Sequence, residues 1–205
     1  AARLDAPVFA HGQHWHVWEE RGRLVFQDET GLIDLPMPAL VGAHQVQNAG
    51  AALAALRALG FGEDAGAAAM RNAEWPARMQ RLRRGPLVEA AGPAELWLDG
   101  GHNPAAGEMI ASVLADLPHR PTHLVCGMLN TKDVTGFLHP LAEHAKTLTA
   151  VSIPGEAATL PAEETARVAA AAGHDSRTAA GVQEAVAAIA AADPGARILI
   201  CGSLY

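Results

Sequence analysis

The stretch ELWLDGGHNPAAGEMIASVL (residues 95–114) decides the fold class, because it joins an apolar run to an alanine-rich segment through a polar turn. The run at 95–98 is typical of a buried strand, and the segment at 104–116 has a helical pattern. Between them, Asn103 is a good N-cap. Pro104 suits the first helical turn, because its φ is fixed and it has no N–H. The stretch therefore predicts a strand, a turn and a helix.

The same alternation continues toward the C-terminus. Apolar runs occur at 95–98, 122–126, 147–153 and 197–201. Helical segments occur at about 104–116, 133–145, 162–172 and 180–192. Strands separated by helices favour an α/β fold with a mainly parallel sheet and helices on both faces. Ligands of such folds gather at the carboxyl ends of the strands, which is where the turn after residue 98 lies.

The N-terminal part of the chain has a different pattern. Three short runs are rich in apolar, aromatic and β-branched residues: 14–18, 23–27 and 32–35. They predict a small antiparallel sheet. A helical pattern then runs from about residue 43 to Gly60, and a short helix is expected at about 63–73. We expect a small α+β region over 1–73 and a second domain over 74–205.

The composition excludes several classes of protein. The chain has 205 residues, 50% of them hydrophobic, and a formal charge of −7. Nucleic-acid binding is not expected, because phosphate neutralisation needs an accumulated positive patch. No stretch approaches the roughly 20 apolar residues of a membrane span. With no secretory signal apparent, we expect a cytoplasmic protein without a membrane partner.

The cysteines and the densest group of histidines do not indicate a metal site. Cys126 and Cys201 each end an apolar run and lack metal-ligand spacing, so we expect reduced cysteines in the core. The segment HGQHWH at 11–16 has no second ligand pair of zinc spacing nearby. Its histidines are expected to face solvent, and an adventitious metal site is the alternative.

The turn after residue 98 has features that suit a ligand. Gly100 and Gly101 let a ligand approach the backbone, and the free N–H groups of the helix start favour an anion. Asp99 could accept hydrogen bonds from sugar hydroxyls, and His102 could donate to a phosphate or carboxylate. The alternative is a capped helix start in which Asp99 and His102 satisfy backbone groups.

Two other places carry candidate binding residues. Gln45 and Asn48 are three positions apart on a predicted helix, so their amides share a face that could pair with an adenine edge. The alternative is a pair of polar residues in an exposed first turn. Arg78 follows a proline at the proposed domain junction, and its planar guanidinium suits phosphate oxygens. A surface or domain-linking arginine is the alternative there.

Five motifs then occur in an order typical of one family. They are GAHQVQNAGAALAAL (42–56), WPARMQ (75–80), LDGGHNPAA (98–106), GMLNTKD (127–133) and CGSLY (201–205). Together they resemble the bacterial dihydrofolate synthase/folylpolyglutamate synthase family of the Mur ligase superfamily, over nearly the whole chain. The resemblance implies that 1–73 is the C-terminal part of a central ATP-binding domain. It implies that 74–205 is a Rossmann-like glutamate ligase domain.

The resemblance also implies an activity and its partners. The family uses ATP and Mg²⁺ to activate a dihydropteroate or folate carboxylate as an acyl phosphate, which L-glutamate then attacks. By motif, Asn48, Arg78 and Asp99 match nucleotide-binding residues, with Asp99 implied at the ribose. His102 is implied near the phosphates or the incoming glutamate, as a catalytic and substrate-binding residue. Ser203 matches a serine implied near the glutamate, and the enzyme is expected to be a monomer.

The sequence departs from the family at Gly101, where alanine is usual, and it lacks a G-x-x-G-K-[ST] phosphate loop. The Mg²⁺ ligands and the pterin pocket are expected in a missing N-terminal half. We therefore expect a C-terminal fragment that does not ligate by itself. Two alternatives stay open: a cell-wall Mur peptide ligase, and a nucleotide-binding module without catalysis. Lys132 and Asp133 fit a family signature to which no role is assigned.

Overall fold

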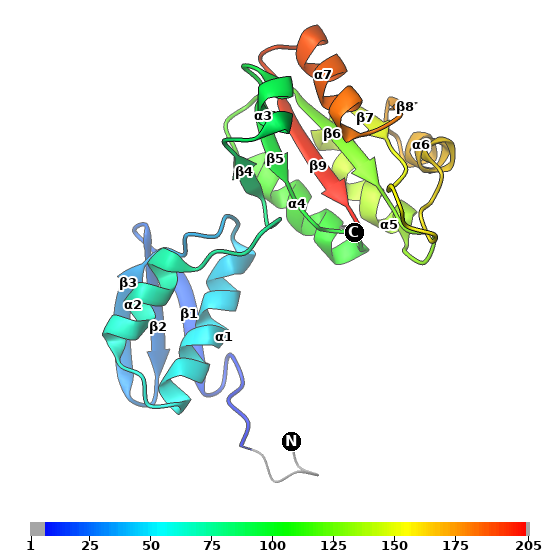
Figure 1. The fold of residues 1–205 in the computed structure, drawn as a ribbon. Helices are drawn as coiled ribbons and strands as arrows, with labels where there is room; N and C mark the ends of the chain where they lie inside the picture. The colour runs from blue at the N-terminus through cyan, green and yellow to red at the C-terminus, as the bar shows by residue number, and fades with distance from the viewer. Residues whose placement is uncertain (1–6, 204–205) are drawn as a thin grey trace. The chain divides into compact units, whose positions relative to one another are not determined.

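The three N-terminal runs pair as an antiparallel sheet in the computed structural model, which describes residues 7–203 (Figure 1). The strands are β1 (Trp15–Glu20), β2 (Arg23–Asp28) and β3 (Gly31–Pro36), in the order β1-β2-β3. Arg21 and Gly22 join the first two strands with φ values of 53° and 73°. Positive φ at both positions gives the two-residue turn whose twist matches the strands it connects. The expected antiparallel sheet is confirmed.

Two helices supply the rest of the core of this part: α1 (His44–Ala58) and α2 (Glu63–Asn72). Their core cluster with the sheet consists of Trp15, Val17, Leu24, Phe26, Ile33, Leu35, Ala49, Leu53 and Met70. A Cβ on Gly50 would lie 2.5 Å from the Val17 Cγ1 atom, so a glycine is needed where α1 crosses the sheet. Helix α1 ends before Gly60, which has a φ of 82°.

The C-terminal part contains the six-stranded sheet and most of the helices. Its strands are β4 (Gln80–Leu82), β5 (Glu95–Leu98), β6 (Thr122–Gly127), β7 (Thr147–Ala150), β8 (Ser176–Thr178) and β9 (Arg197–Gly202). Its helices are α3 (Pro86–Ala91), α4 (Pro104–Asp116), α5 (Val134–Leu138), the 3-10 helix η2 (His139–His144), α6 (Ala162–Ala171) and α7 (Val182–Ala192). The expected alternation of strands and helices is confirmed.

The strand order is β4-β5-β9-β6-β7-β8, and every pair is parallel except β4 with β5. One apolar cluster joins the sheet to α4, α5, η2 and α6. A second cluster joins the opposite face to α3 and α7. Figure 1 shows β9 running between β5 and β6 with helices on either side of the sheet. The predicted α/β class, a mainly parallel sheet covered on both faces, is confirmed.

Several boundaries differ from those expected. The strand expected at 147–153 ends at Ala150, and the helix expected at 133–145 divides into α5 and η2. Pro140 lies in the first turn of η2, and a proline lacks the N–H that a continuing α-helix would use. The helical pattern expected to run to Gly60 ends as α1 at Ala58, so Leu59 lies beyond the helix and is 73% exposed. The strands β4 and β8 and the helix α3 were not expected.

The chain divides into two compact units, residues 1–75 and 76–205. The boundary expected from the sequence was between residues 73 and 74. The division into an ATP-binding and a ligase domain stays a prediction. No helix among the described residues is both long and apolar enough to cross a membrane.

Candidate functional site

The candidate site is built where three parallel strands of the second unit end. β5 ends at Leu98, and β9 and β6 end at Gly202 and Gly127, which face each other in the register. The loop 99–103 follows β5 directly and leads into α4. This is the carboxyl edge of the sheet, where α/β folds bind ligands.

The side chain of Asp99 is completely buried in this loop. One carboxylate oxygen, Oδ1, accepts a 2.7 Å hydrogen bond from the Gly101 N–H. The other, Oδ2, accepts a 2.8 Å hydrogen bond from the Met79 N–H. In this geometry no face of Asp99 is open to a ligand. In this structure the carboxylate accepts hydrogen bonds from backbone groups, as the alternative interpretation states. The expected contact with a ribose is not tested and stays a prediction.

Further backbone hydrogen bonds tie the loop to its neighbours. The Gly100 N–H donates to the Ala77 carbonyl oxygen at 2.9 Å, and the Gly202 N–H donates to the Gly101 carbonyl oxygen at 3.1 Å. A Cβ on Gly101 would lie 2.9 Å from the Asp99 Oδ1 atom and 2.9 Å from the Ile110 Cδ1 atom. The packing around the loop is therefore tight at the position where the family usually has alanine.

His102 is half-buried, and its Nδ1 atom lies 2.8 Å from the Gly100 carbonyl oxygen. Because a carbonyl oxygen only accepts, this contact requires the proton on Nδ1. The Nε2 atom of the neutral ring is then a hydrogen-bond acceptor. Asn103 caps α4 as predicted, since its Oδ1 atom accepts from the Ala106 N–H at 2.9 Å.

Arg78 is exposed between two buried residues, Ala77 and Met79. Ala77 and Met79 have φ values of 55° and 40°, in the left-handed region that non-glycine residues seldom adopt. The Gln80 side chain accepts a 3.0 Å hydrogen bond from the Ala77 N–H. The turn 77–79 is thus held from two directions, by Gln80 and by the loop 99–101.

Ser203 follows β9, and its N–H donates to the Gly127 carbonyl oxygen at 2.9 Å. Its hydroxyl is buried and has no hydrogen-bond partner within residues 7–203. The residue borders a cavity of about 460 Å³ whose other walls include Val125, Val151, Ile153 and Ile200. A buried, unpartnered hydroxyl beside a cavity is a group that a polar ligand would satisfy.

Asn48 belongs to the first unit, whereas the other four predicted site residues belong to the second. It is exposed on α1, and its Nδ2 atom donates to the Gln45 Oε1 atom at 3.0 Å. The prediction that these two amides share a helix face is confirmed. Gln45 is buried, which differs from the alternative of two exposed polar residues.

The remaining candidates have structural surroundings. Asp133 accepts a hydrogen bond from the Gly136 N–H and caps α5, a role that the sequence did not reveal. Cys126 and Cys201 are buried, free and in register on β6 and β9, as expected for core residues. The adjacent Cys126 side chain and burial raise the pKa of the Cys201 thiol well above its usual value.

No metal-binding group of three His, Cys, Asp or Glu side chains is found within residues 7–203. His11, His14 and His16 are exposed, as predicted. The sequence did not indicate the part played by the backbone of residues 77, 79 and 100. These groups bond to partners far along the chain and carry no side-chain signature.

Both the sequence and the fold of the chain are similar to those of known proteins. Residues 77–204 match the family model described as Mur ligase, glutamate ligase domain. The chain belongs to the Mur ligase family. Within this family it is 30% identical to the folylpolyglutamate synthase of Lacticaseibacillus casei over 229 residues, which covers 100% of this chain and 49% of that protein.

Solved structures of folylpolyglutamate synthases and of FolC share the fold. The chain is 28% identical to Mycobacterium tuberculosis folylpolyglutamate synthase complexed with ADP, with a TM-score of 0.81 over 98% of this chain and 48% of the other. It is 26% identical to E. coli FolC in complex with DHPP and ADP, with a TM-score of 0.80 over 94% of this chain and 44% of the other. The chain thus spans somewhat less than half the length of each of these two enzymes.

Proposed function

We propose that the chain is part of an ATP-dependent ligase that adds L-glutamate to dihydropteroate, to folates or to both. The proposal is carried by the match of residues 77–204 to a glutamate ligase domain. Arg78 lies in the turn 77–79 of this domain and His102 in the loop 99–103, and Asp99 links the two segments. The folylpolyglutamate synthase relatives support the reaction class. The ADP in two similar structures supports ATP as the nucleotide, and DHPP in one of them supports a pterin-type substrate.

The reaction has two steps. A carboxylate oxygen of the pteroate or folate attacks the γ-phosphorus of ATP while the bond to the β-phosphate oxygen breaks, giving an acyl phosphate and ADP. The amino group of L-glutamate then attacks the acyl carbon and loses a proton, and phosphate leaves as the amide forms. In such transfers the protein contributes mainly placement and charge stabilisation.

Arg78 and Asn48 are proposed to bind the nucleotide. The exposed guanidinium of Arg78 can form paired, charge-assisted hydrogen bonds with phosphate oxygens. Asn48 is proposed to contact the nucleotide as well, and its hydrogen bond to Gln45 restricts rotation of its amide. Asp99 is assigned to the nucleotide site as well, and its direct contact with the ribose remains a prediction.

His102 and Ser203 are proposed to handle L-glutamate. Because Nδ1 of His102 donates to Gly100, its Nε2 atom suits the amino group of glutamate better than an anionic phosphate. Nε2 can accept the proton that the amine loses during attack. The buried hydroxyl of Ser203 is proposed to bind a glutamate carboxylate.

Mg²⁺ would neutralise phosphate charge in the complete enzyme. Residues 7–203 contain no group of three His, Cys, Asp or Glu side chains that could hold a metal ion. As the resemblance implies, the ligands of Mg²⁺ are proposed to lie in another part of the enzyme, and no step is assigned to the metal here. A monomeric enzyme in the cytoplasm completes the proposal, and light scattering during gel filtration tests the monomer.

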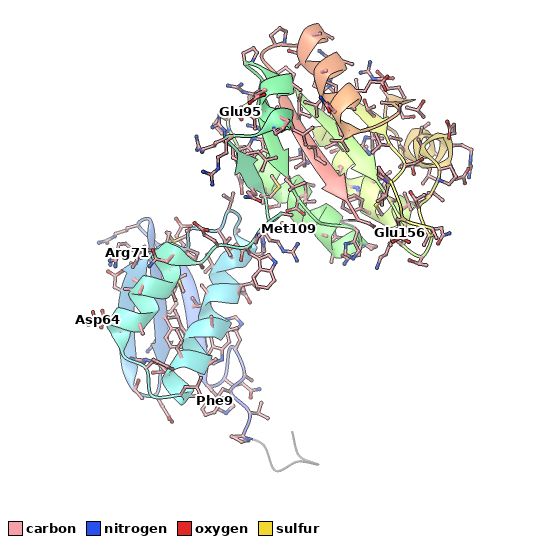
Figure 2. All side chains as sticks on the ribbon, viewed as in Figure 1. Phe9, Asp64, Arg71, Glu95, Met109 and Glu156 are labelled. Atoms are coloured by element: carbon pink, nitrogen blue, oxygen red, sulfur yellow. The ribbon has the colours of Figure 1, made fainter. Side chains whose placement is uncertain are left out.

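The test is a ligation assay on the complete protein that contains this chain. Incorporation of labelled L-glutamate into dihydropteroate or tetrahydrofolate is measured with ATP and Mg²⁺. Arg78→Ala is compared with Arg71→Ala, which removes an exposed arginine at the end of α2 (Figure 2). We expect Arg78→Ala to lower kcat/KM for ATP about 100-fold, as loss of a charge-stabilising donor does in other enzymes.

Arg71→Ala should leave kcat/KM unchanged. Incorporation into neither acceptor, with ATP still bound, would favour the non-catalytic module instead. Incorporation of an amino acid into a cell-wall precursor would favour a Mur peptide ligase. Full activity of Arg78→Ala with an unchanged KM for ATP would overturn the assignment of Arg78.

A further inference from the structure

We propose that Asp99 is a positioning residue that holds the turn 77–79 and so presents Arg78 to the nucleotide. The inference rests on the proposed function, because it concerns how an ATP-binding arginine is placed. It assigns to Asp99 an effect through the backbone of another segment, and the alternative is the direct contact with the ribose.

The backbone of the turn 77–79 is strained and needs contacts with other segments to stabilise it. Ala77 and Met79, with φ values of 55° and 40°, are two of the three non-glycine residues with positive φ between residues 7 and 203. Side chains with a Cβ disfavour this region, so such residues persist where their surroundings hold them. The conformation of the turn also sets where its side chains point: Ala77 and Met79 are buried, and Arg78 between them is exposed.

Asp99 stabilises this turn through a direct hydrogen bond. Its Oδ2 atom accepts the Met79 N–H at 2.8 Å, across twenty positions of sequence. The neighbouring Gly100 N–H donates to the Ala77 carbonyl oxygen at 2.9 Å. Both strained residues of the turn are therefore anchored to the loop that begins with Asp99, one by the side chain and one by the backbone.

The chemistry of the contact explains an acid at this position. Two N–H donors, from Met79 and Gly101, meet the two carboxylate oxygens, and hydrogen bonds to an ionised acceptor are shorter and stronger than neutral ones. An asparagine would place its NH₂ group against one of these N–H donors and lose that bond. With the side chain completely buried, the carboxylate acts on these backbone groups.

A double-mutant cycle in the complete enzyme tests whether Asp99 acts through Arg78. The variants are Asp99→Asn, Arg78→Ala and both together, and the readout is the Kd of the non-hydrolysable analogue AMPPNP. We expect Asp99→Asn to weaken binding about tenfold when Arg78 is present and less than about twofold when Arg78 is alanine. Equal weakening in both backgrounds would mean that Asp99 contacts the nucleotide itself, and would overturn the proposal.

Amide hydrogen exchange measured without nucleotide separates this inference from the proposed function. In Asp99→Asn we expect faster exchange at the Met79 and Gly101 amides and unchanged exchange in β6. Asp116→Asn, which alters an exposed acid at the end of α4, is the matched control and should change neither amide. Unchanged exchange at Met79 in Asp99→Asn would overturn the positioning role. If Arg78→Ala did not affect nucleotide binding, the assignment of Arg78 within the proposed function would fail instead.

A second variant covers the case in which Asp99→Asn does not fold. Gln80→Ala removes an exposed side chain that accepts the Ala77 N–H. We expect it to weaken AMPPNP binding in the same direction, by about threefold, and only when Arg78 is present. Unchanged binding in Gln80→Ala would contradict the view that the hold on this turn sets the placement of Arg78.

Discussion

Gly202 faces Gly127 so closely that a Cβ on Gly202 would lie 2.1 Å from the Gly127 carbonyl oxygen. Gly202 also has a φ of 108°, which side chains with a Cβ rarely adopt. The pair lets β9 and β6 end together, and the next N–H, that of Ser203, donates to the same carbonyl oxygen. Two glycines thus determine where the Ser203 hydroxyl lies.

Gly202→Ala should destabilise the second unit, because it adds both backbone strain and a clash with the carbonyl group of Gly127. We expect the free energy of unfolding to fall by about 3 kcal/mol in urea denaturation. Gly195→Ala is the control, since its Cβ would approach nothing closer than the Asp193 Oδ1 atom at 4.0 Å. Equal stability of the two variants would contradict the role given to this close approach.

Glu95→Ala should destabilise the protein because it leaves a buried arginine without its carboxylate. Glu95, labelled in Figure 2 at the start of β5, lies 3.6 Å from Arg197, which is 3% exposed, and 3.1 Å from Arg81. Removing one partner of a buried pair costs about 3–5 kcal/mol, and we expect the lower end of that range, measured by urea unfolding.

Two further variants check the explanation. Glu164→Ala breaks an exposed pair with Arg167 on α6 and should change stability far less. Adding Arg197→Met to Glu95→Ala should recover much of the lost stability, because the buried charge is then gone. No recovery would show that Glu95 stabilises the fold by some other contact.

Stability should decrease in mildly acidic solution because of two buried histidines. Burial lowers the pKa of His123 and of His174 from 6.5, and the contacts to Asp193 and to the Leu138 carbonyl oxygen oppose this only in part. The unfolded state then binds these protons more readily than the folded state. The contribution of the two neutral histidines to the free energy of unfolding is therefore fully present above about pH 6.5. It is lost as the pH falls toward their folded-state pKa values.

The free energy of unfolding should fall by up to about 1.4 kcal/mol per pH unit for each histidine below pH 6.5. Urea titrations between pH 7.5 and pH 5 measure the slope, and His174→Gln should remove about half of it. A slope of zero over this interval would rule out the lowered pKa values.

The long apolar elements could be predicted from the sequence, whereas the short polar ones could not. β5, β6 and β9 are continuous apolar runs, and α4 has both an N-cap and a proline to mark its start. By contrast, β4 and β8 are three residues each, with the sequences QRL and SRT. Their extended conformation comes from pairing with a neighbouring strand, which local sequence does not encode.

The candidate site could be located from the sequence, but its internal connections could not. The turn at 99–103 is recognisable by its glycines, acid and histidine at the end of an apolar run. The hydrogen bond from the Met79 N–H to Asp99 is invisible in sequence, because every residue type except proline offers the same backbone donor. The exposure of Arg78 likewise follows from the φ values of its neighbours, and no residue in that turn is a glycine.

β9 is the central partner of both β5 and β6, although it comes last in chain order among the strands of residues 7–203 (Figure 1). While the chain is being synthesised, β5 and β6 therefore leave the ribosome with unpaired, apolar edges, and these edges stay unpaired until residues 197–202 have been made. Pairing across such a separation is slow, and open strand edges favour aggregation. A truncation before residue 197 should thus yield an insoluble product in place of a smaller domain, so cellular yield depends on finishing β9.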